Sequence, residues 1–505
     1  MKKYDYIIIG AGMGGLSTAN FLAKYNKKVL VLEKHDKPGG CVTSFKRKNA
    51  QFDCGLEGLY ELNKNETIPQ FFAFWGKEIE SQKCNDKISC FVDDKVYSFD
   101  GEQLEKDFIK HFPNKAEKVK KLFNINNTIF KEMYSGSEAP KPPYDMSLIE
   151  LIKFGINNMK NKPMFMKYGM KNASNFFNKQ IDDDILSTII FSKAGYEMVY
   201  MGYAYRWAVL GKTYYPVGGM QAIPNLAVES MKEKGVELKL KTEVGKIIIN
   251  NNKAVGVQTI DGLEYYSDNI ISNVSPEFTL KMIPNEAKGK LVLKDKTKDR
   301  EIFPSTAIIF ATMNNKYNFN NSNYISIIDS KAYKNMGNYT KENCPILLQV
   351  SPMQINKDYK AITIMLPLKY EYENYWKTNQ KERGKEYKEF KEDVKNTILN
   401  RITEKLGVEF KNNLVDAEIS TPLTYERYLH SSKGSFMGYA IDKKNYGKFL
   451  KQKTSINGLY LVGQYVFPGF GVAGVMASGY YLAKDLLKEE NINLEHDFKE
   501  FFKQV

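Results

Sequence analysis

Two short runs of apolar residues near the start of the chain are separated by a glycine-rich turn and a helical stretch. Residues 6–9 read Tyr-Ile-Ile-Ile, residues 29–32 read Val-Leu-Val-Leu, and small and apolar residues fill positions 16–24 between them. Apolar runs without a polar position are typical of strands that are covered on both faces, as in a parallel sheet. The pattern therefore predicts a strand–helix–strand unit.

The turn between the first strand and the helix has the spacing of a dinucleotide-binding motif. It reads Gly-Ala-Gly-Met-Gly-Gly over residues 10–15, and Glu33 follows the second strand. In such a motif Gly10 permits the tight turn, Gly12 lets the backbone approach a pyrophosphate, and Gly15 lets the helix pack on the strand. The helix N-terminus favours the anion, and Glu33 stands where a ribose ligand is expected. We therefore predict an ADP-containing cofactor.

A second glycine-rich segment and an uncharged C-terminal stretch extend this prediction. Residues 38–45 begin Pro-Gly-Gly, and Phe-Asp-Cys-Gly follows at 52–55. This backbone would lie on the pyrophosphate and ribityl chain of a larger dinucleotide, whereas an ordinary turn before a hairpin is the alternative. Residues 454–483 carry no charge, but their glycines and polar positions favour a buried strand at 458–464 and a core helix at 475–487 over a membrane span. The N-terminus of that helix suits the pyrimidine edge of a flavin.

Alternation and helical periodicity predict the remaining elements. Residues 66–212 are expected to be largely helical and rich in aromatic side chains. The four predicted strands between residues 307 and 366 are expected to form a sheet under the substrate site. Strands are predicted at 237–241, 244–249, 254–259, 307–312, 324–328, 346–350 and 361–366, and helices at 220–234 and 381–406.

Three further motifs complete a family pattern. Tyr-Pro-Val-Gly-Gly-Met stands at 215–220, Ile-Ser-Asn at 271–273 and Thr-Pro-Leu-Thr at 421–424. With the glycine motifs, they resemble the phytoene desaturase, carotenoid isomerase and retinol saturase group of FAD proteins, which are relatives of the amine oxidases. The resemblance implies an α/β fold with a Rossmann-type, glutathione reductase-like FAD-binding domain and an inserted α+β substrate domain.

The length of 505 residues and the 43% hydrophobic content allow more than one core, in agreement with two interleaved domains. The expected FAD-binding domain is discontinuous and comprises residues 1–65, 213–300 and 416–490. The expected substrate domain comprises residues 66–212 and 301–415, and residues 491–505 form a charged tail.

The resemblance also implies which residues hold FAD, with Val244 bracketing the adenine through its backbone. Cys41 stands where many amine oxidases carry an arginine, and Gln464 replaces the acid that commonly meets the ribityl chain, so amine oxidation is disfavoured. The expected cofactor-binding residues are Gly10, Gly12, Met13, Gly14, Gly15, Glu33, Lys34, Gly40, Cys41, Val42, Gly55, Leu56, Val244, Gly463, Gln464, Gly471, Val472 and Ala473.

Catalytic residues are less well defined, because flavin chemistry on a polyene needs at most one proton donor or acceptor near the ring. The resemblance places Glu57 and Tyr60 beside the isoalloxazine, although Glu57 could equally be a solvent-exposed loop acid. His430 lies within a matching segment but a lone histidine is more often structural. No metal site is predicted. Substrate contacts are expected from an aromatic stretch that could equally be core: Arg206, Trp207 and Tyr214.

Composition narrows the function classes. The formal net charge is +14, but the lysines are spread along the chain instead of forming a compact basic domain, so no nucleic-acid partner is expected. Five cysteines without a Cys-x-x-Cys pair indicate neither a redox dithiol nor a disulfide framework and predict a cytoplasmic protein. No secretory signal and no second Rossmann unit for NAD(P)H are recognisable, so electrons are expected to pass through an external donor or acceptor of unknown identity.

One segment departs from the even spread of charge. Residues 148–179 are rich in Leu, Ile, Met and Phe, and Glu150 is the one acid before Asp182. Such a basic amphipathic segment can lie peripherally on the inner, anionic face of a membrane. Pro163 divides this segment into two helices. These helices could also form a lid over an apolar cavity, or pack against the core with a lysine-coated outer face. Its lysines include Lys153, Lys160, Lys162, Lys167 and Lys171.

Three functions remain open at this point. The first is an FAD-dependent oxidoreductase that saturates or desaturates carbon–carbon bonds of a carotenoid, a retinoid or an unsaturated fatty acyl substrate. The second is a redox-neutral isomerase that uses reduced FAD to shift or rotate a double bond. The third is a lipid carrier of the same fold, against which the intact glycine motifs and Glu33 argue.

Overall fold

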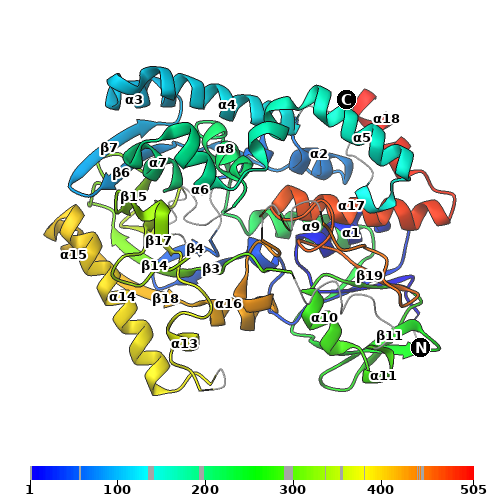
Figure 1. Ribbon diagram of the computed structural model, residues 1–505. Coiled ribbons are helices and arrows are strands. Elements are labelled where there is room, and N and C mark those ends of the chain that lie inside the picture. Colours follow the sequence, from blue (N-terminus) through cyan, green and yellow to red (C-terminus); the bar gives the residue numbers. More distant parts are fainter. Residues whose placement is uncertain are drawn as a thin grey trace.

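Figure 1 shows the computed structural model, which contains a parallel sheet with its helices and a larger mixed sheet with its own. This arrangement confirms the predicted α/β fold class. The structure describes residues 3–55, 58–134, 142–192, 198–288, 300–335, 337–352, 357–379, 382–440, 442, 444 and 448–504.

The parallel sheet gathers strands from distant parts of the chain in the order β19-β13-β1-β2-β9. Ile7 of β1 lies opposite Leu30 on one side and Ile270 on the other. Every residue of β1 and β2 is buried, which explains their apolar sequences. The strands are β1 (Tyr6–Ile9), β2 (Val29–Leu32), β9 (Glu237–Lys239), β13 (Ile270–Ser272) and β19 (Leu459–Leu461).

The first and last long helices of this body pack directly against each other. A Cβ atom on Gly479 would lie 2.7 Å from the backbone nitrogen of Thr18 and 2.8 Å from the carbonyl oxygen of Gly14, so the crossing requires glycine. At the same crossing, Ser17 Oγ donates to the carbonyl of Met476 at 2.7 Å. The helices of this body include α1 (Met13–Ala23), α9 (Ala222–Glu233) and α17 (Val472–Glu489).

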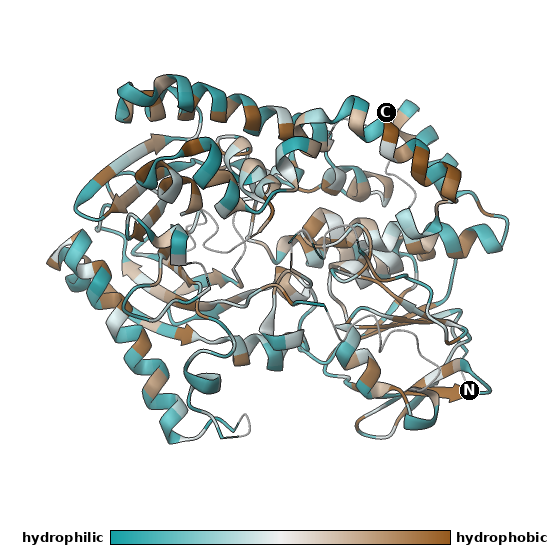
Figure 2. Ribbon diagram, in the orientation of Figure 1, coloured by the Kyte–Doolittle hydropathy of each residue, from teal (hydrophilic) through white to brown (hydrophobic). Residues whose placement is uncertain are grey.

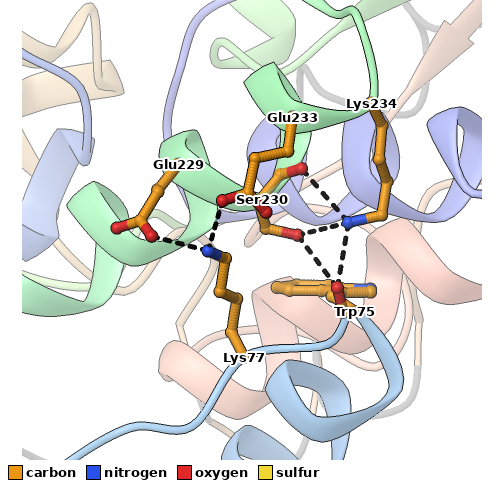
Figure 3. Close-up of polar contacts among 6 residues, drawn as sticks. All are labelled: Trp75, Lys77, Glu229, Ser230, Glu233 and Lys234. Atoms are coloured by element: carbon orange, nitrogen blue, oxygen red, sulfur yellow. Dashed lines mark hydrogen bonds and ion pairs between the residues drawn. The ribbon is translucent and has the colours of Figure 1, made fainter.

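The helix α2 (Thr67–Phe74) is fixed to α9 at its C-terminal end, as Figure 3 shows. Lys77 Nζ forms ion pairs with two glutamates of α9 at 2.5 and 2.7 Å. Lys234 Nζ donates to the carbonyl of Trp75 at 2.9 Å and to Ser230 Oγ at 2.8 Å. These contacts join α2 to the helix layer of the parallel sheet.

A small antiparallel sheet adjoins the parallel one, and a hairpin turn joins its first two strands. Asn251 and Asn252 both adopt positive φ, as a two-residue turn of type I′ requires. The elements here are β10 (Val244–Asn250), β11 (Lys253–Thr259), β12 (Glu264–Tyr266), α10 (Pro276–Met282) and α11 (Asn285–Lys288).

The larger sheet has seven strands in the order β18-β14-β17-β16-β15-β6-β7. The sequence pattern predicts β14, β15, β16 and β17 but not β18. It also does not predict β6 and β7, which lie in the region expected to be largely helical. β6 pairs in parallel with β15, so both parts of the chain share one sheet. The strands are β6 (Lys87–Val92), β7 (Lys95–Asp100), β14 (Ala307–Asn314), β15 (Tyr324–Ile328), β16 (Ile346–Val350), β17 (Tyr359–Leu366) and β18 (Leu414–Ser420).

Helices cover this sheet and share its hydrophobic core, and Figure 1 shows the long α14 beside β18 and β14. They are α3 (Leu104–His111), α4 (Ala116–Tyr134), α6 (Ala173–Phe176), α7 (Asp184–Phe191), α8 (Tyr200–Ala208), α14 (Lys385–Leu406) and α15 (Val408–Asn412). The remaining elements include β3 (Ser44–Arg47), β4 (Ala50–Asp53), β5 (Ser81–Lys83), β8 (Tyr214–Pro216), α13 (Glu373–Trp376), α16 (Pro422–Leu429) and α18 (Leu494–Gln504).

The basic amphipathic segment forms α5 (Leu148–Asn161), which ends two residues before Pro163. Proline lacks a backbone N–H and restricts the residue before it, which accounts for the break. A π-helical turn (Phe165–Gly169) follows. Within the described ranges, no helix has both the length and the hydropathy that crossing a membrane requires.

Candidate functional site

A cleft of about 310 Å³ lies at the carboxyl ends of the parallel strands, the edge at which open α/β sheets bind ligands. The turn after β1 and the residue after β2 form one wall, and the start of β10 and the residues after β13 form another. The lining includes Gly10, Gly12, Glu33, Lys34, Gly40, Val244, Asn273 and His430.

The Glu33 carboxylate is fixed at the wall of this cleft. One oxygen accepts a hydrogen bond from the backbone N–H of Ala11 at 2.7 Å, and the other accepts from the N–H of His35 at 2.9 Å. The side chain is buried. A carboxylate has lone pairs for further donors, so Glu33 is both held in place and able to accept from a ribose hydroxyl.

The two glycine-rich turns lie against each other. The N–H of Gly39 donates to the carbonyl of Ala11 at 2.8 Å, and Gly12 and Gly39 form a β-bridge. A Cβ atom on Gly40 would lie 3.3 Å from Gly12 Cα. The hairpin β3–β4 does follow the second turn, but the turn also supplies backbone to the same cleft. Together the two turns form a cradle of backbone for an extended anionic ligand.

Two helices begin without a side-chain cap beside these turns. The residues that precede α1 and α17 are Gly12 and Gly471, so neither helix has a side chain that caps its first N–H groups. A Cβ atom on Gly471 would meet no atom within 4 Å, so there is space in front of Val472 and Ala473. Uncapped N–H groups bind anions and polar acceptors. The residues present therefore fit a cofactor with a pyrophosphate and a polar ring edge.

Asn273 occupies the point where the glycine turns and the strand β19 converge. Its Nδ2 donates to the carbonyl of Gly10 at 3.3 Å. Cβ atoms on Gly12 or Gly14 would each lie 2.7 Å from its amide, and one on Gly463 would lie 2.9 Å from it. The sequence supplied Asn273 as part of a motif, but local pattern gave it no role. In the structure it holds the end of β1 in place.

Asp53 joins three of the motifs through buried hydrogen bonds. Its carboxylate accepts from Ser44 Oγ at 2.5 Å, from the N–H of Met220 at 3.2 Å, and from the Tyr215 hydroxyl. Burial raises the pKa of Asp53, and these hydrogen bonds oppose the shift. The second glycine segment, the Phe-Asp-Cys-Gly motif and the Tyr-Pro-Val-Gly-Gly motif thus meet at one carboxylate, which sequence reasoning missed.

His430 lines the same cleft as Val244 and Glu33. Its ring stacks on Phe278 at 4.4 Å with an interplanar angle of 8°. Burial, followed by the charge of Lys34, lowers the pKa of His430 to about 4, so the ring is neutral at physiological pH. A neutral, stacked imidazole suits packing against a planar ring of a ligand better than it suits proton transfer in catalysis.

Four other candidates, which the structure describes, are not among the residues that line this cleft: Tyr60, Arg206, Trp207 and Tyr214. Tyr60 packs edge-on against Phe130 at 5.2 Å, and burial raises the pKa of its hydroxyl. Trp207 is buried in the core of the larger sheet, and its Nε1 donates to the carbonyl of Ile190 at 2.9 Å. This position favours the core alternative for Trp207, and contact of its side chain with a substrate stays a prediction.

Arg206 is half-buried in α8, and Tyr214 lies in β8, where its N–H and carbonyl pair with Leu59. Glu57 and Leu56 lie outside the described residues. Cys41 is half-buried beside Gly40, and burial raises the pKa of its thiol to about 12, so it is a neutral thiol.

Comparisons with known proteins agree with this geometry. Residues 8–75 match the family described as an NAD(P)-binding Rossmann-like domain. The chain is 26% identical to prolycopene isomerase 1 of an Oncidium hybrid cultivar, over 95% of this chain and 83% of that protein. It is 22% identical to all-trans-retinol 13,14-reductase of Danio rerio, over 98% and 87%. It is 26% identical to 1-hydroxycarotenoid 3,4-desaturase of Flavobacterium sp. strain P99-3, over 97% and 100%.

Solved structures share the fold. An oxidoreductase from Methanosarcina mazei aligns with a TM-score of 0.60 at 15% identity, over 95% of this chain and 99% of that one. Cyclohexylamine oxidase from Brevibacterium oxydans IH-35A aligns with a TM-score of 0.58 at 13% identity, over 96% and 100%. The resemblance that the motifs indicate is confirmed by the sequence relatives, because the chain is similar over most of its length to proteins named as a prolycopene isomerase, a retinol reductase and a carotenoid desaturase.

Proposed function

We propose that the protein is an FAD-dependent oxidoreductase that saturates or desaturates carbon–carbon double bonds of a lipophilic polyene-type substrate. A carotenoid, a retinoid or an unsaturated fatty acyl chain would be such a substrate. The observation that carries the proposal is the cleft, where two glycine turns, a fixed acid and the uncapped N-terminus of α1 meet. The chain is also similar over nearly its full length to enzymes named for carotenoids and retinol.

In this proposal, each wall of the cleft holds one part of the cofactor. Glu33 accepts from a ribose hydroxyl, the backbone of Gly12 and Gly40 contacts the pyrophosphate, and the backbone of Val244 brackets the adenine. His430 and Phe278 line the adenine side. The segments at 463–464 and 471–473 contact the ribityl chain and the pyrimidine edge. Bound FAD would supply hydride transfer at its N5 atom.

The structure constrains the residues that would contact the substrate less closely than those that would hold the cofactor. A hydride added to a double bond requires a proton at the neighbouring carbon, and Tyr60, with a raised pKa, keeps its proton at physiological pH. We retain Tyr60 and Glu57 as candidates for that proton and Arg206 and Tyr214 as candidates for substrate contact. Net saturation consumes two electrons from an external reductant, and net desaturation delivers two to an external acceptor.

A redox-neutral isomerase is the second candidate function. The names of the prolycopene isomerase relatives favour it, because these proteins are as similar to this chain as the desaturase is. The same cofactor cleft serves both chemistries. A lipid carrier would need no flavin, and a colourless purified protein would support that function instead.

Anaerobic incubation with a pool of polyenes and unsaturated lipids, followed by mass spectrometry, separates these functions. One arm uses protein with chemically reduced flavin, and the other uses oxidised protein with an artificial electron acceptor. A product two hydrogens heavier in the first arm identifies a saturase, and one two hydrogens lighter in the second identifies a desaturase. An unchanged mass at a new retention time identifies an isomerase.

Free FAD, reduced in the same way but without protein, is the matched control for non-enzymatic reduction. The absence of any product in both arms, from protein that contains flavin, would contradict the proposed chemistry on these substrate classes.

A further inference from the structure

The helix α5 turns its apolar side toward solvent. Leu148, Ile149, Ile152, Ile156 and Met159 follow one another at helical spacing along one stripe, and each is between 54% and 73% exposed. Figure 2 shows brown residues along α5 at the upper right edge of the molecule. A stripe of large exposed aliphatic side chains on a surface is typical of an interaction site.

A different side of α5 faces the protein. Phe154, Gly155 and Asn158 are its half-buried residues, and they lie beside the apolar stripe, not within it. All 14 residues of α5 are described, and none is buried. Surface helices normally turn the apolar stripe inward. The arrangement therefore removes the alternative in which this helix is core-facing with a lysine-coated outer face.

The helix is anchored at both ends, so its exposed stripe is held in position. Ser147 and Glu150 form a capping box at its start, with the Ser147 N–H donating to the Glu150 carboxylate at 2.6 Å. Tyr144, just before it, packs against the core of the parallel-sheet body. Beyond its end, the N–H of Phe165 donates to the Glu132 carboxylate at 2.6 Å. Both ends of α5 are therefore attached to the rest of the protein.

The stripe is flanked by positive charge. Lys153 and Lys160 are exposed on α5 next to the stripe, and Lys167 is exposed beyond Pro163, close to the exposed Met166. The single acid of α5 caps the helix N-terminus. Lysines at the edge of an apolar stripe let the aliphatic side chains enter the headgroup region of a bilayer while the ammonium groups reach the phosphates.

We propose that α5 docks the protein onto an anionic lipid bilayer, with its apolar stripe inserted among the headgroups. A second copy of the chain is a poorer occupant, because a twofold contact through this stripe would bring its lysines close to those of the copy. The overall charge of +14 adds to the attraction toward anionic lipid. This docking goes beyond the proposed function and holds whichever lipid is the substrate and whichever direction the chemistry takes.

Vesicle sedimentation tests the docking. The purified holoprotein is mixed with vesicles of phosphatidylcholine alone or of phosphatidylcholine with phosphatidylglycerol, and the bound fraction is measured after centrifugation. We expect binding to the anionic vesicles that weakens with salt. The double substitution Ile149→Glu with Ile156→Glu should lower the partition coefficient by about tenfold or more, because two aliphatic side chains that would insert into the bilayer are replaced by charges.

The lysines and two other exposed aliphatic residues provide matched comparisons. Lys153→Gln and Lys160→Gln should each weaken binding to anionic vesicles by about fivefold and leave binding to phosphatidylcholine unchanged. Ile260→Glu and Val408→Glu alter side chains that are 71% and 61% exposed outside α5, and they should bind like the wild type. Flavin content and thermal unfolding of every variant verify that the fold is intact.

Two results would overturn the proposal. The first is that the wild-type protein does not sediment with anionic vesicles, or that the Ile149→Glu, Ile156→Glu variant sediments with them as strongly as the wild type. The second is a wild-type dimer in sedimentation velocity that the α5 substitutions convert to a monomer, which would make α5 a contact between copies. A wild-type protein that binds anionic vesicles but does not act on carbon–carbon double bonds would count against the proposed function alone.

Discussion

At the scale of single residues, buried polar side chains fix the walls of the cleft. Asp53 ties the second glycine segment to the segment at 215–220, and Asn273 supports the turn after β1. Their hydrogen bonds are made with groups far apart in the sequence. Removing one partner would leave a buried donor or acceptor unpaired, which costs about 1–3 kcal/mol. These residues therefore position the cofactor site without being expected to touch the substrate.

His430 provides a prediction on pH dependence. In the cofactor-free protein, burial lowers its pKa from 6.5 to about 4. Between these values the unfolded chain binds a proton that the folded protein does not, so this contribution to stability is complete above pH 6.5 and is lost as the pH falls toward 4. His430→Phe keeps the stacking on Phe278, and we expect it to remove up to about 3 kcal/mol of the acid-induced loss.

Urea unfolding of the cofactor-free protein across that pH range measures the effect. The same substitution at His496, which is exposed on α18, is the control. A wild-type slope in the His430 variant would show that the histidine is not held neutral by its surroundings.

Among single residues, the sequence identifies the glycines of the two turns and Glu33 as part of the cleft, because these residues lie within short continuous motifs. It does not identify Asp53 and Asn273 as organising residues, since their partners come from other segments. Trp207 shows that local sequence cannot separate a core position from a cavity-lining one. An aromatic residue near a motif fits a substrate cavity by sequence alone, but the structure gives its indole a carbonyl partner and a place in the core.

At the scale of elements, the crossing of α1 and α17 sets the geometry of the cofactor cradle. Gly479→Ala would place a methyl group within 2.8 Å of two backbone atoms of α1. We expect it to push the helices apart, lower the free energy of unfolding by about 1–3 kcal/mol, and weaken flavin retention, because α1 begins at the glycine turn. Thermal or denaturant unfolding and flavin content measure both effects.

The same substitution at Gly155 is the matched control. Gly155 lies within α5, and a Cβ atom there would meet no atom within 4 Å. Alanine is the better helix former, so Gly155→Ala should raise stability by about 0.5–1 kcal/mol. Equal effects of the two substitutions would mean that the close crossing is not what requires Gly479.

Local pattern predicts elements that are buried on both faces or strongly alternating, which is why the β1–α1–β2 unit and the strands β14, β15, β16 and β17 are found. It fails for β6, whose sequence mixes lysine, serine and cysteine with apolar residues. The strand is stabilised by its parallel pairing with β15, more than two hundred residues later in the chain. Such pairing leaves no periodic signal in the sequence of β6.

At the scale of the whole molecule, the chain passes between two bodies of secondary structure. The parallel sheet draws strands from the beginning, middle and end of the chain, and the larger sheet draws β6 and β7 from before residue 212 and the rest from after 301. The division into two domains with these boundaries stays a prediction. The exposure of the apolar stripe of α5 could not be predicted from the sequence, because an inward and an outward stripe have the same periodicity.

The central claim is that the cleft holds FAD, and the most direct test is to release and identify the cofactor of the purified protein. We predict FAD, by mass and absorbance, in an amount equimolar with the chain. Glu33→Ala should weaken FAD binding by about 1–3 kcal/mol, or about ten- to a hundredfold, while Glu264→Ala, outside the cleft, should not. A released nicotinamide dinucleotide, the absence of any cofactor, or undiminished FAD binding by the Glu33 variant would contradict the account.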